Sequence, residues 1–126
     1  MTDITPAVTA GRPLIQGYGA GGFRIAGTVL TGSVIVFPDR TVPWDAESYE
    51  SIAPASLSDV IDAATDIEVL LIGCGARIGL PRPDIIDALK AVSVVPEWMD
   101  TGAACRTFNV LLSEDRAAAA ALIAVE

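Results

Sequence analysis

The sequence predicts an α/β domain whose first half is rich in β-hairpins. Three observations predict it: β-branched and aromatic runs separated by glycine between residues 13 and 38, helical periodicity from residue 56, and alternating strands and helices thereafter. Such crossover units require at least some parallel strand pairing. A length of 126 residues suits one domain. We therefore expect a single α/β domain over residues 13–126, preceded by a flexible arm over residues 1–12, which lack periodicity.

The glycine-rich first half predicts a meander of hairpins. Its expected strands are residues 23–25, 28–30 and 33–37, with a tight turn at residues 31–32. Residues 38–40, Pro-Asp-Arg, predict the next turn. A short strand followed by a connecting segment is expected between residues 40 and 55, where no clear periodicity is present.

Beyond residue 56 the apolar residues recur with a helical period. Ser56 can cap a first helix whose apolar face carries Leu57, Val60, Ile61 and Ala64. Residues 68–72 form an apolar run typical of a central strand buried on both faces. A second helix is expected from Pro83 to Lys90, followed by a short buried strand at residues 92–95.

A third helix is expected to begin at Asp100 or Thr101, since either side chain can cap it. One of its faces is apolar, and another carries Gly102, Arg106, Asn109 and Ser113. For the tail, residues 117–125, the simplest expectation is a short helix that restarts near Ser113. The alternation of these residues would also fit a strand.

The amino-acid composition limits the classes of partner that we expect. Apolar residues make up 52% of the chain, but Gly, Pro, Asp or Arg interrupts every run well before the roughly 18 residues that span a bilayer, so we expect no membrane insertion. Eight basic against sixteen acidic residues give a net charge of −8, which repels a phosphate backbone, so no nucleic-acid partner is expected. The first eleven residues lack the features of a signal or transit peptide, which predicts a cytoplasmic location.

The chain lacks the residue types of the commonest catalytic sites. It contains no histidine, which excludes Ser-His-Asp and Cys-His mechanisms, and its two thiols, Cys74 and Cys105, lack C-x-x-C spacing. The acidic residues are scattered rather than paired in one motif. We therefore nominate no catalytic residue, no metal site and no cofactor, and we expect a binding function rather than an enzyme.

Residues 17–22, Gly-Tyr-Gly-Ala-Gly-Gly, match the G-x-G-x-x-G pattern of dinucleotide-binding proteins. In those proteins a helix follows the glycines and its N-terminus binds the pyrophosphate. Here the next residues predict strands and turns instead. We therefore interpret the motif as a flexible turn or a close approach of two backbones.

Gly73 and Gly75 flank Cys74 at the end of a predicted buried strand, the position at which open α/β sheets tend to bind ligands. Without a histidine, Cys74 would ionise only beside an arginine or a helix N-terminus, and burial opposes its ionisation. An unreactive thiol is therefore expected in preference to a nucleophile.

The start of the third helix provides the second half of the candidate site. Asp100 and Thr101 precede small residues and Arg106 one turn later, an arrangement that can accept a carboxylate or phosphate. Alternatively, Asp100 caps the helix and Arg106 pairs with Asp100 or Glu97. Both interpretations stay open. The candidate ligand-binding residues are Gly73, Cys74, Gly75, Asp100, Thr101, Arg106 and Asn109.

Several segments together resemble a domain family of unknown function first seen structurally in a methanogen protein. They are residues 15–19, 21–25, 32–34, Trp44, 99–101, 104–107 and 109–112, of which Met-Asp-Thr and Ala-Cys-Arg-Thr are the most specific. The resemblance spans about residues 13–125. It implies a compact α/β domain with a mixed central sheet, helices packed on it and no established activity. The resemblance also implies Thr in many relatives at the glycine-flanked position where this chain has Cys74, which argues against a shared nucleophile.

Eukaryotic relatives of that family include a mitochondrial complex I assembly factor and an adipogenesis-associated protein. The resemblance and the missing catalytic residues favour a non-enzymatic binding or assembly module with a protein partner, with a role in respiratory-complex assembly as a hypothesis. The alternative is a site for a small anion, or an enzyme, between residues 73–75 and 100–106.

Overall fold

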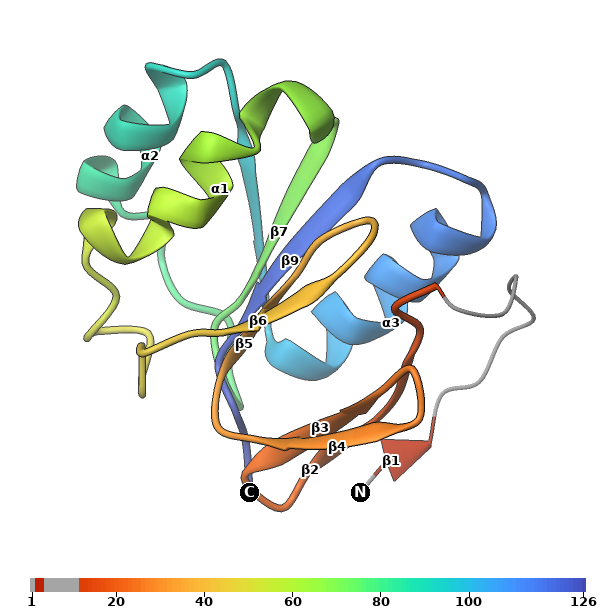
Figure 1. The fold of residues 1–126 in the computed structure, drawn as a ribbon. Helices are drawn as coiled ribbons and strands as arrows, with labels where there is room; N and C mark the ends of the chain where they lie inside the picture. Colours follow the sequence, from red (N-terminus) through yellow and green to blue (C-terminus); the bar gives the residue numbers. More distant parts are fainter. Residues whose placement is uncertain (1, 4–11) are drawn as a thin grey trace.

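The computed structural model describes residues 2–3 and 12–126, which form three layers (Figure 1). A five-stranded sheet lies in the middle, two helices cover one of its faces, and a third helix and a second sheet cover the other. This confirms the predicted α/β class and the hairpin-rich first half. The arm predicted for residues 1–12 lies outside the described residues except at positions 2, 3 and 12.

The second sheet is built from the glycine-rich first half. It contains strands β1 (Thr2–Asp3), β2 (Ile15–Gly19), β3 (Gly22–Ile25) and β4 (Thr28–Thr31), antiparallel and in that order. The turn between β2 and β3 passes through Gly19, Ala20 and Gly21, all with positive φ, and a side chain on Gly22 would collide with the backbone of Leu30. The glycine motif is thus a turn with a close backbone approach, as expected, and a strand follows it.

The central sheet is mixed. It contains β5 (Val34–Val36), β6 (Thr41–Pro43), β7 (Val69–Gly73), β8 (Pro96–Met99) and β9 (Ala118–Leu122), in the order β6-β5-β9-β7-β8. Strand β7 runs parallel to both β8 and β9, whereas β5 runs antiparallel to β6 and β9. The parallel pairing expected of the crossover units is therefore confirmed.

Four predictions about local structure are wrong. The turn at residues 31–32 joins no hairpin, because among the described residues β4 pairs only with β3 and the next strand, β5, belongs to the central sheet. The tail forms the central strand β9 rather than a helix, because burial on both faces of the sheet outweighs the helix propensity of its alanines. Residues 92–95 form no strand: the N–H groups of Val92, Ser93 and Val94 bond to the last carbonyls of the preceding helix, and β8 begins only at Pro96. Ser56 does not cap a helix, since its hydroxyl bonds to the Ala53 carbonyl.

The helical segments lie near the predicted positions. They are η1 (Pro54–Leu57), α1 (Ser58–Asp62), η2 (Ala64–Asp66), α2 (Pro83–Lys90) and α3 (Thr101–Ser113). The first predicted helix is thus a short α-helix flanked by two 3-10 turns. Asp100 caps α3, because its carboxylate accepts a 2.8 Å hydrogen bond from the Ala103 N–H.

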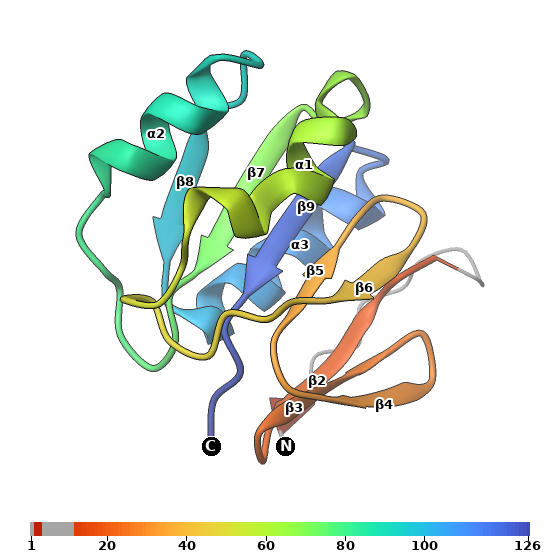
Figure 2. The same cartoon turned by 60° about the vertical axis from the view of Figure 1, so that its left-hand side comes forward.

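Alternate residues of the central strands supply two separate cores. On the α1 and α2 side lie Ile35, Leu70, Ile72, Ala119 and Ala121; on the other side lie Val34, Leu71, Ala118, Ala120 and Leu122. Figure 2 shows α1 in front of the sheet and α3 behind it. The second core also contains Phe23 and Phe108, which join the second sheet and α3 to the central sheet.

Candidate functional site

The carboxyl ends of β7, β8 and β9 meet beside the start of α3. Gly73 pairs with Met99 on one side and with Leu122 on the other, so these three parallel strands end at one edge of the sheet. A pocket of about 580 Å³ opens there, within the range of ligand sites and at the place where α/β sheets bind them. It is lined by residues 47–50, 74–76 and 123–126 together with Tyr18, Asp100, Gly102 and Arg106.

Thr101, a predicted site residue, lies behind the pocket lining and bonds to two of the segments that form it. Its hydroxyl donates to the Ile123 carbonyl at 2.7 Å and accepts from the Gly75 N–H at 2.9 Å, and its own N–H donates to the Gly75 carbonyl at 2.8 Å. The side chain is fully buried and does not line the pocket. Thr101 therefore joins the ends of β7 and β9 to the first turn of α3.

Glycine is required on both sides of Cys74, for different reasons. A side chain on Gly73 would lie 2.9 Å from Leu122 Cδ2 and 3.0 Å from Thr101 Cα, so there is no room for one. Gly75, which also lines the pocket, has a φ of 105°, a value that other residues rarely adopt. The glycines allow the tight turn on which the pocket is built.

Cys74 lines the pocket, but its thiol is buried. Burial raises the pKa of the Cys74 thiol, and the nearby negative charges of Asp100 and Glu50 raise it further. Cys105 is more enclosed, and burial raises its pKa to about 12. Both thiols therefore stay protonated at neutral pH, which is consistent with the expectation that Cys74 is unreactive.

Asn109 is a predicted site residue that lies away from the pocket. Its side chain accepts a 2.9 Å hydrogen bond from the Ile15 N–H and donates a 2.7 Å bond to the Ile15 carbonyl. With 1% of its surface exposed, Asn109 fastens β2 to α3. In the sequence, its position on the polar face of the helix suggested that Asn109 contacts a ligand. In the structure, its side chain bonds instead to the backbone of the neighbouring strand β2.

Arg106 lies on the surface of α3 and faces the pocket. Its guanidinium donates a 3.0 Å hydrogen bond to the Tyr18 hydroxyl, and no carboxylate of the described residues lies within 4.0 Å of it. The predicted ion pair with Asp100 or Glu97 is therefore absent from this part of the chain. Tyr18 covers Gly102, where an added side chain would lie 2.7 Å from the tyrosine oxygen.

Sequence reasoning missed the wall formed by residues 47–50. Tyr49 packs against Gly79, its hydroxyl donates to the Leu80 carbonyl, and its ring meets Trp98 edge-on with 5.9 Å between centroids. These contacts place Glu47 and Glu50 beside the strand ends. No sequence signal marks this segment, because it lacks periodicity and approaches Gly75 only through the strand order of the sheet.

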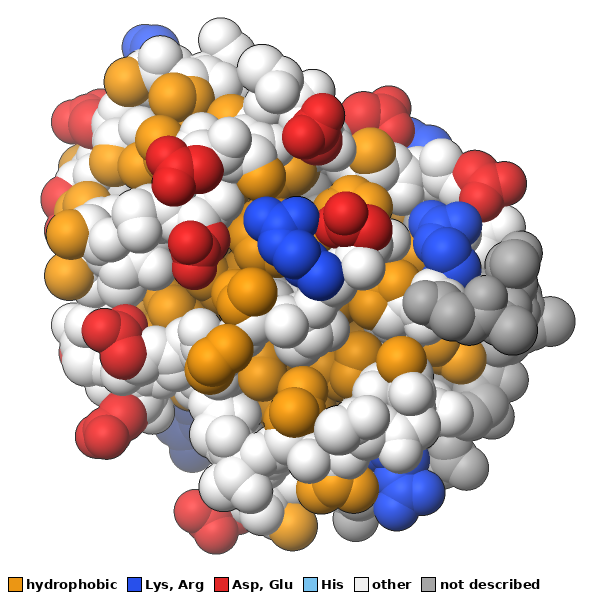
Figure 3. Space-filling view, in the orientation of Figure 1, with side chains coloured by type: hydrophobic (Ala, Val, Ile, Leu, Met, Phe, Trp, Pro, Cys, Tyr) orange, Lys and Arg blue, Asp and Glu red, His pale blue; other side chains and the backbone are white. Residues whose placement is uncertain are grey.

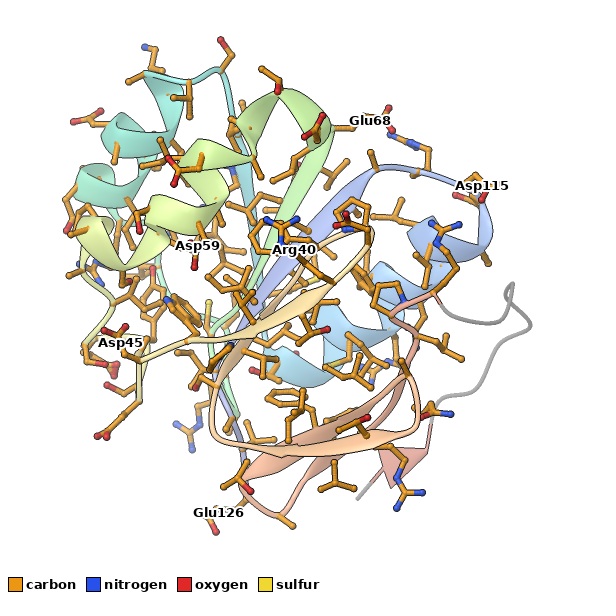
Figure 4. All side chains as sticks on the ribbon, viewed as in Figure 1. Arg40, Asp45, Asp59, Glu68, Asp115 and Glu126 are labelled. Atoms are coloured by element: carbon orange, nitrogen blue, oxygen red, sulfur yellow. The ribbon has the colours of Figure 1, made fainter. Side chains whose placement is uncertain are left out.

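Acidic residues predominate among the charged residues of the lining. Glu47, Glu50, Asp100 and Glu126 contribute carboxylates, and Arg106 is the only lining cation among the described residues. Figure 3 shows that red acidic side chains also outnumber blue basic ones on the face in view, and Figure 4 labels Glu126 at the lower end of the molecule. This balance disfavours a small anion as the ligand.

None of the helices in the described residues could span a membrane, because none is both sufficiently long and sufficiently apolar. Nor does that part of the chain bring together three His, Cys, Asp or Glu residues in a way that could hold a metal ion.

A protein-family model described as "Protein of unknown function (DUF498/DUF598)" matches residues 15–123. A Danio rerio protein named "NADH dehydrogenase [ubiquinone] 1 alpha subcomplex assembly factor 3" is 39% identical over 110 residues, which are 87% of this chain and 63% of that protein. The chain thus spans less than two thirds of this relative's length.

Two further relatives come from bacteria. An uncharacterized Rhodobacter capsulatus protein is 38% identical over 115 residues, which cover 90% of this chain and 86% of that protein. A Bartonella henselae protein described as an outer membrane protein has a crystal structure that matches this fold with a TM-score of 0.86. Its sequence is 41% identical, and the match covers 93% of this chain and 98% of that one.

Proposed function

The chain belongs to the DUF498/DUF598 family, and from that membership we propose that it is a protein-binding module that acts in the assembly of a respiratory NADH dehydrogenase. The family match agrees with the resemblance carried by residues 99–101 and 104–107. A protein partner follows from this role, because an assembly factor acts by binding other polypeptides.

One observation carries the proposal: 39% identity to a protein named as an assembly factor, over 87% of this chain. The region matched by the family model, residues 15–123, contains all three strand ends and most of the pocket lining. The relative also contains residues that this chain does not match, and the proposal does not include interactions made by those residues.

The alternative of an anion-binding protein has little physical support. Arg106 is present in the pocket and free of carboxylate partners among the described residues, as an anion site would require. However, the four carboxylates of the lining would repel a second negative charge. We therefore do not propose an anionic ligand as the physiological one.

Deletion of the gene in the organism that encodes the chain tests the proposed function. We expect the membranes to contain less fully assembled NADH dehydrogenase on native gels, with partly assembled complexes accumulating. Expression of the wild-type chain should restore the complex. Normal amounts of active NADH dehydrogenase in the deletion strain would overturn the proposal.

Fractionation of the complemented cells tests the predicted cytoplasmic location, which remains a proposal.

A further inference from the structure

The carboxylates around the pocket are not neutralised by the protein itself. The four salt bridges of the described residues use Arg12, Arg40, Arg82 and Arg116 and leave Glu47, Glu50 and Glu126 without a cationic partner in that part of the chain. Asp100 caps α3 with one of its carboxylate oxygens, which accepts the hydrogen bond from the Ala103 N–H. Four negative groups therefore surround a pocket into which one arginine faces.

The arginine lies on a different wall from the two glutamates. Arg106 belongs to α3 and is hydrogen-bonded to Tyr18, which packs with the core on the α3 side of the sheet. Residues 47–50 follow Trp44 and Ala46, which pack with the core on the opposite side. Since the hydrogen bond to Tyr18 holds Arg106 on its own wall, the side formed by Glu47 and Glu50 remains open to a cation from outside.

A rim of exposed apolar residues lies beside the same wall. The contacts of Tyr49 with Gly79 and Leu80 fix the loop that follows Ala76, a residue of the lining. On this loop Ile78 and Leu80 leave 65% and 84% of their surfaces exposed. Large apolar side chains exposed next to a polar cleft are typical of a surface that binds another protein.

We propose that this pocket binds a lysine or arginine side chain of a partner protein, with apolar residues of the same partner segment packed on Ile78 and Leu80. A basic side chain suits the pocket because its alkyl stem packs against apolar walls while its charged end meets carboxylates. The inference rests on the proposed function, since it specifies which chemistry of the protein partner is recognised.

Peptide titration followed by NMR tests the inference directly. The probes are the capped peptides acetyl-Leu-Ala-Arg-Leu-Ala-amide and its Glu counterpart, added to the ¹⁵N-labelled full chain. We expect saturable shifts of the amide signals of Gly75, Gly102 and residues 124–126 with the Arg peptide only, and weaker binding at higher salt. Equal or stronger binding of the Glu peptide would overturn the inference in favour of an anion site, and no saturable shift at these amides would also overturn it.

Two matched double variants distinguish the effect of charge at the pocket from the effect of the overall net charge. Glu47→Lys with Glu50→Lys should weaken binding of the Arg peptide at least tenfold. Asp62→Lys with Asp87→Lys changes the net charge equally, but at exposed positions on α1 and α2 outside the lining, and should change the affinity less than threefold. Equal effects of the two pairs would show that only net charge matters and would overturn a defined pocket.

The same variants separate this inference from the proposed function in cells. In the deletion strain we expect the Asp62→Lys, Asp87→Lys chain to restore NADH dehydrogenase assembly and the Glu47→Lys, Glu50→Lys chain not to restore it, at equal protein levels. If deletion impairs assembly but both variants restore it, the function stands and the basic-side-chain inference fails.

Discussion

The buried polar residues of α3 and the polar residues in the segment 47–50 have opposite environments. Thr101 and Asn109 are at most 1% exposed, and each bonds to backbone groups of other elements. Glu47 and Glu50 are exposed and have no ionic partner among the described residues. The difference shows that the buried polar residues join elements of the fold, Thr101 behind the pocket and Asn109 between β2 and α3, whereas the exposed ones are available to a ligand.

Their energetic consequences should differ accordingly. Removing a buried side chain leaves backbone N–H or C=O groups without partners, which costs about 1–3 kcal/mol for each group. Removing an exposed carboxylate leaves water in its place at almost no cost. The following variants test this contrast in order of decreasing effect.

Asn109→Ala should have the largest effect. It leaves both the N–H and the carbonyl of Ile15 without their bonds to Asn109 in the core, so the free energy of unfolding should fall by about 3 kcal/mol in urea denaturation. The control is Ser113→Ala on the same helix, which removes an exposed bond to the Val110 carbonyl and should cost less than about 0.5 kcal/mol. Equal costs would mean that Asn109 does not secure β2.

Thr101→Val keeps the shape of the side chain but removes its bonds to Gly75 and Ile123. We expect the free energy of unfolding to fall by about 2 kcal/mol, and the Gly75 amide to exchange faster with deuterium. Thr107→Val, at a partly exposed site on the same helix, serves as the control. Unchanged protection of the Gly75 amide would contradict the role given to Thr101.

Glu68 is an intermediate case, since it is exposed but bonded to the backbone. The hydrogen bond from the Ala117 N–H, aided by Arg116, holds the pKa of Glu68 below its ordinary value of 4.5. A lowered pKa means that the ionised form stabilises the fold above about pH 4.5 and that this contribution is lost as the pH falls through the folded-state pKa. The stability difference between wild type and Glu68→Gln should therefore shrink on acidification in urea titrations at pH 7 and pH 3. A difference independent of pH would contradict this account.

Glu47→Gln and Glu50→Gln should have the smallest effect on stability. Each should change the free energy of unfolding by no more than about 0.5 kcal/mol in thermal or urea denaturation, because neither side chain is buried or ion-paired among the described residues. A loss above about 1 kcal/mol would place these residues with Thr101 in the framework of the pocket.

The same contrast explains which parts of the site could be predicted from sequence. Asp100 could be identified as a cap, and Gly73 and Gly75 as the end of a buried strand, because these signals are local. The wall around Tyr49 could not, since its approach to Gly75 depends on the order of distant strands. Asn109 was placed on the correct helical face, but sequence cannot show that the backbone of Ile15, 94 positions away, occupies its hydrogen bonds.

The fold was predictable to a similar degree. Hairpins and helices whose glycine turns and apolar periods lie within a few residues were confirmed, as for β3, β4 and α2. A helix was expected at β9 because alanine intrinsically favours helices. In the structure, the small size of these alanines instead allows both layers to pack closely on the central strand. That packing depends on residues elsewhere in the chain.

The position of β9 has a consequence for synthesis on the ribosome. Strand β9 is the last strand of the described chain, yet it lies between β5 and β7, so neither of these has its central neighbour until residue 122 has emerged. Before then the nascent chain presents two unpaired strand edges, which are prone to aggregation. Completion of the central sheet must therefore follow translation of β9, and nascent chains truncated before residue 118 should need a chaperone to remain in solution.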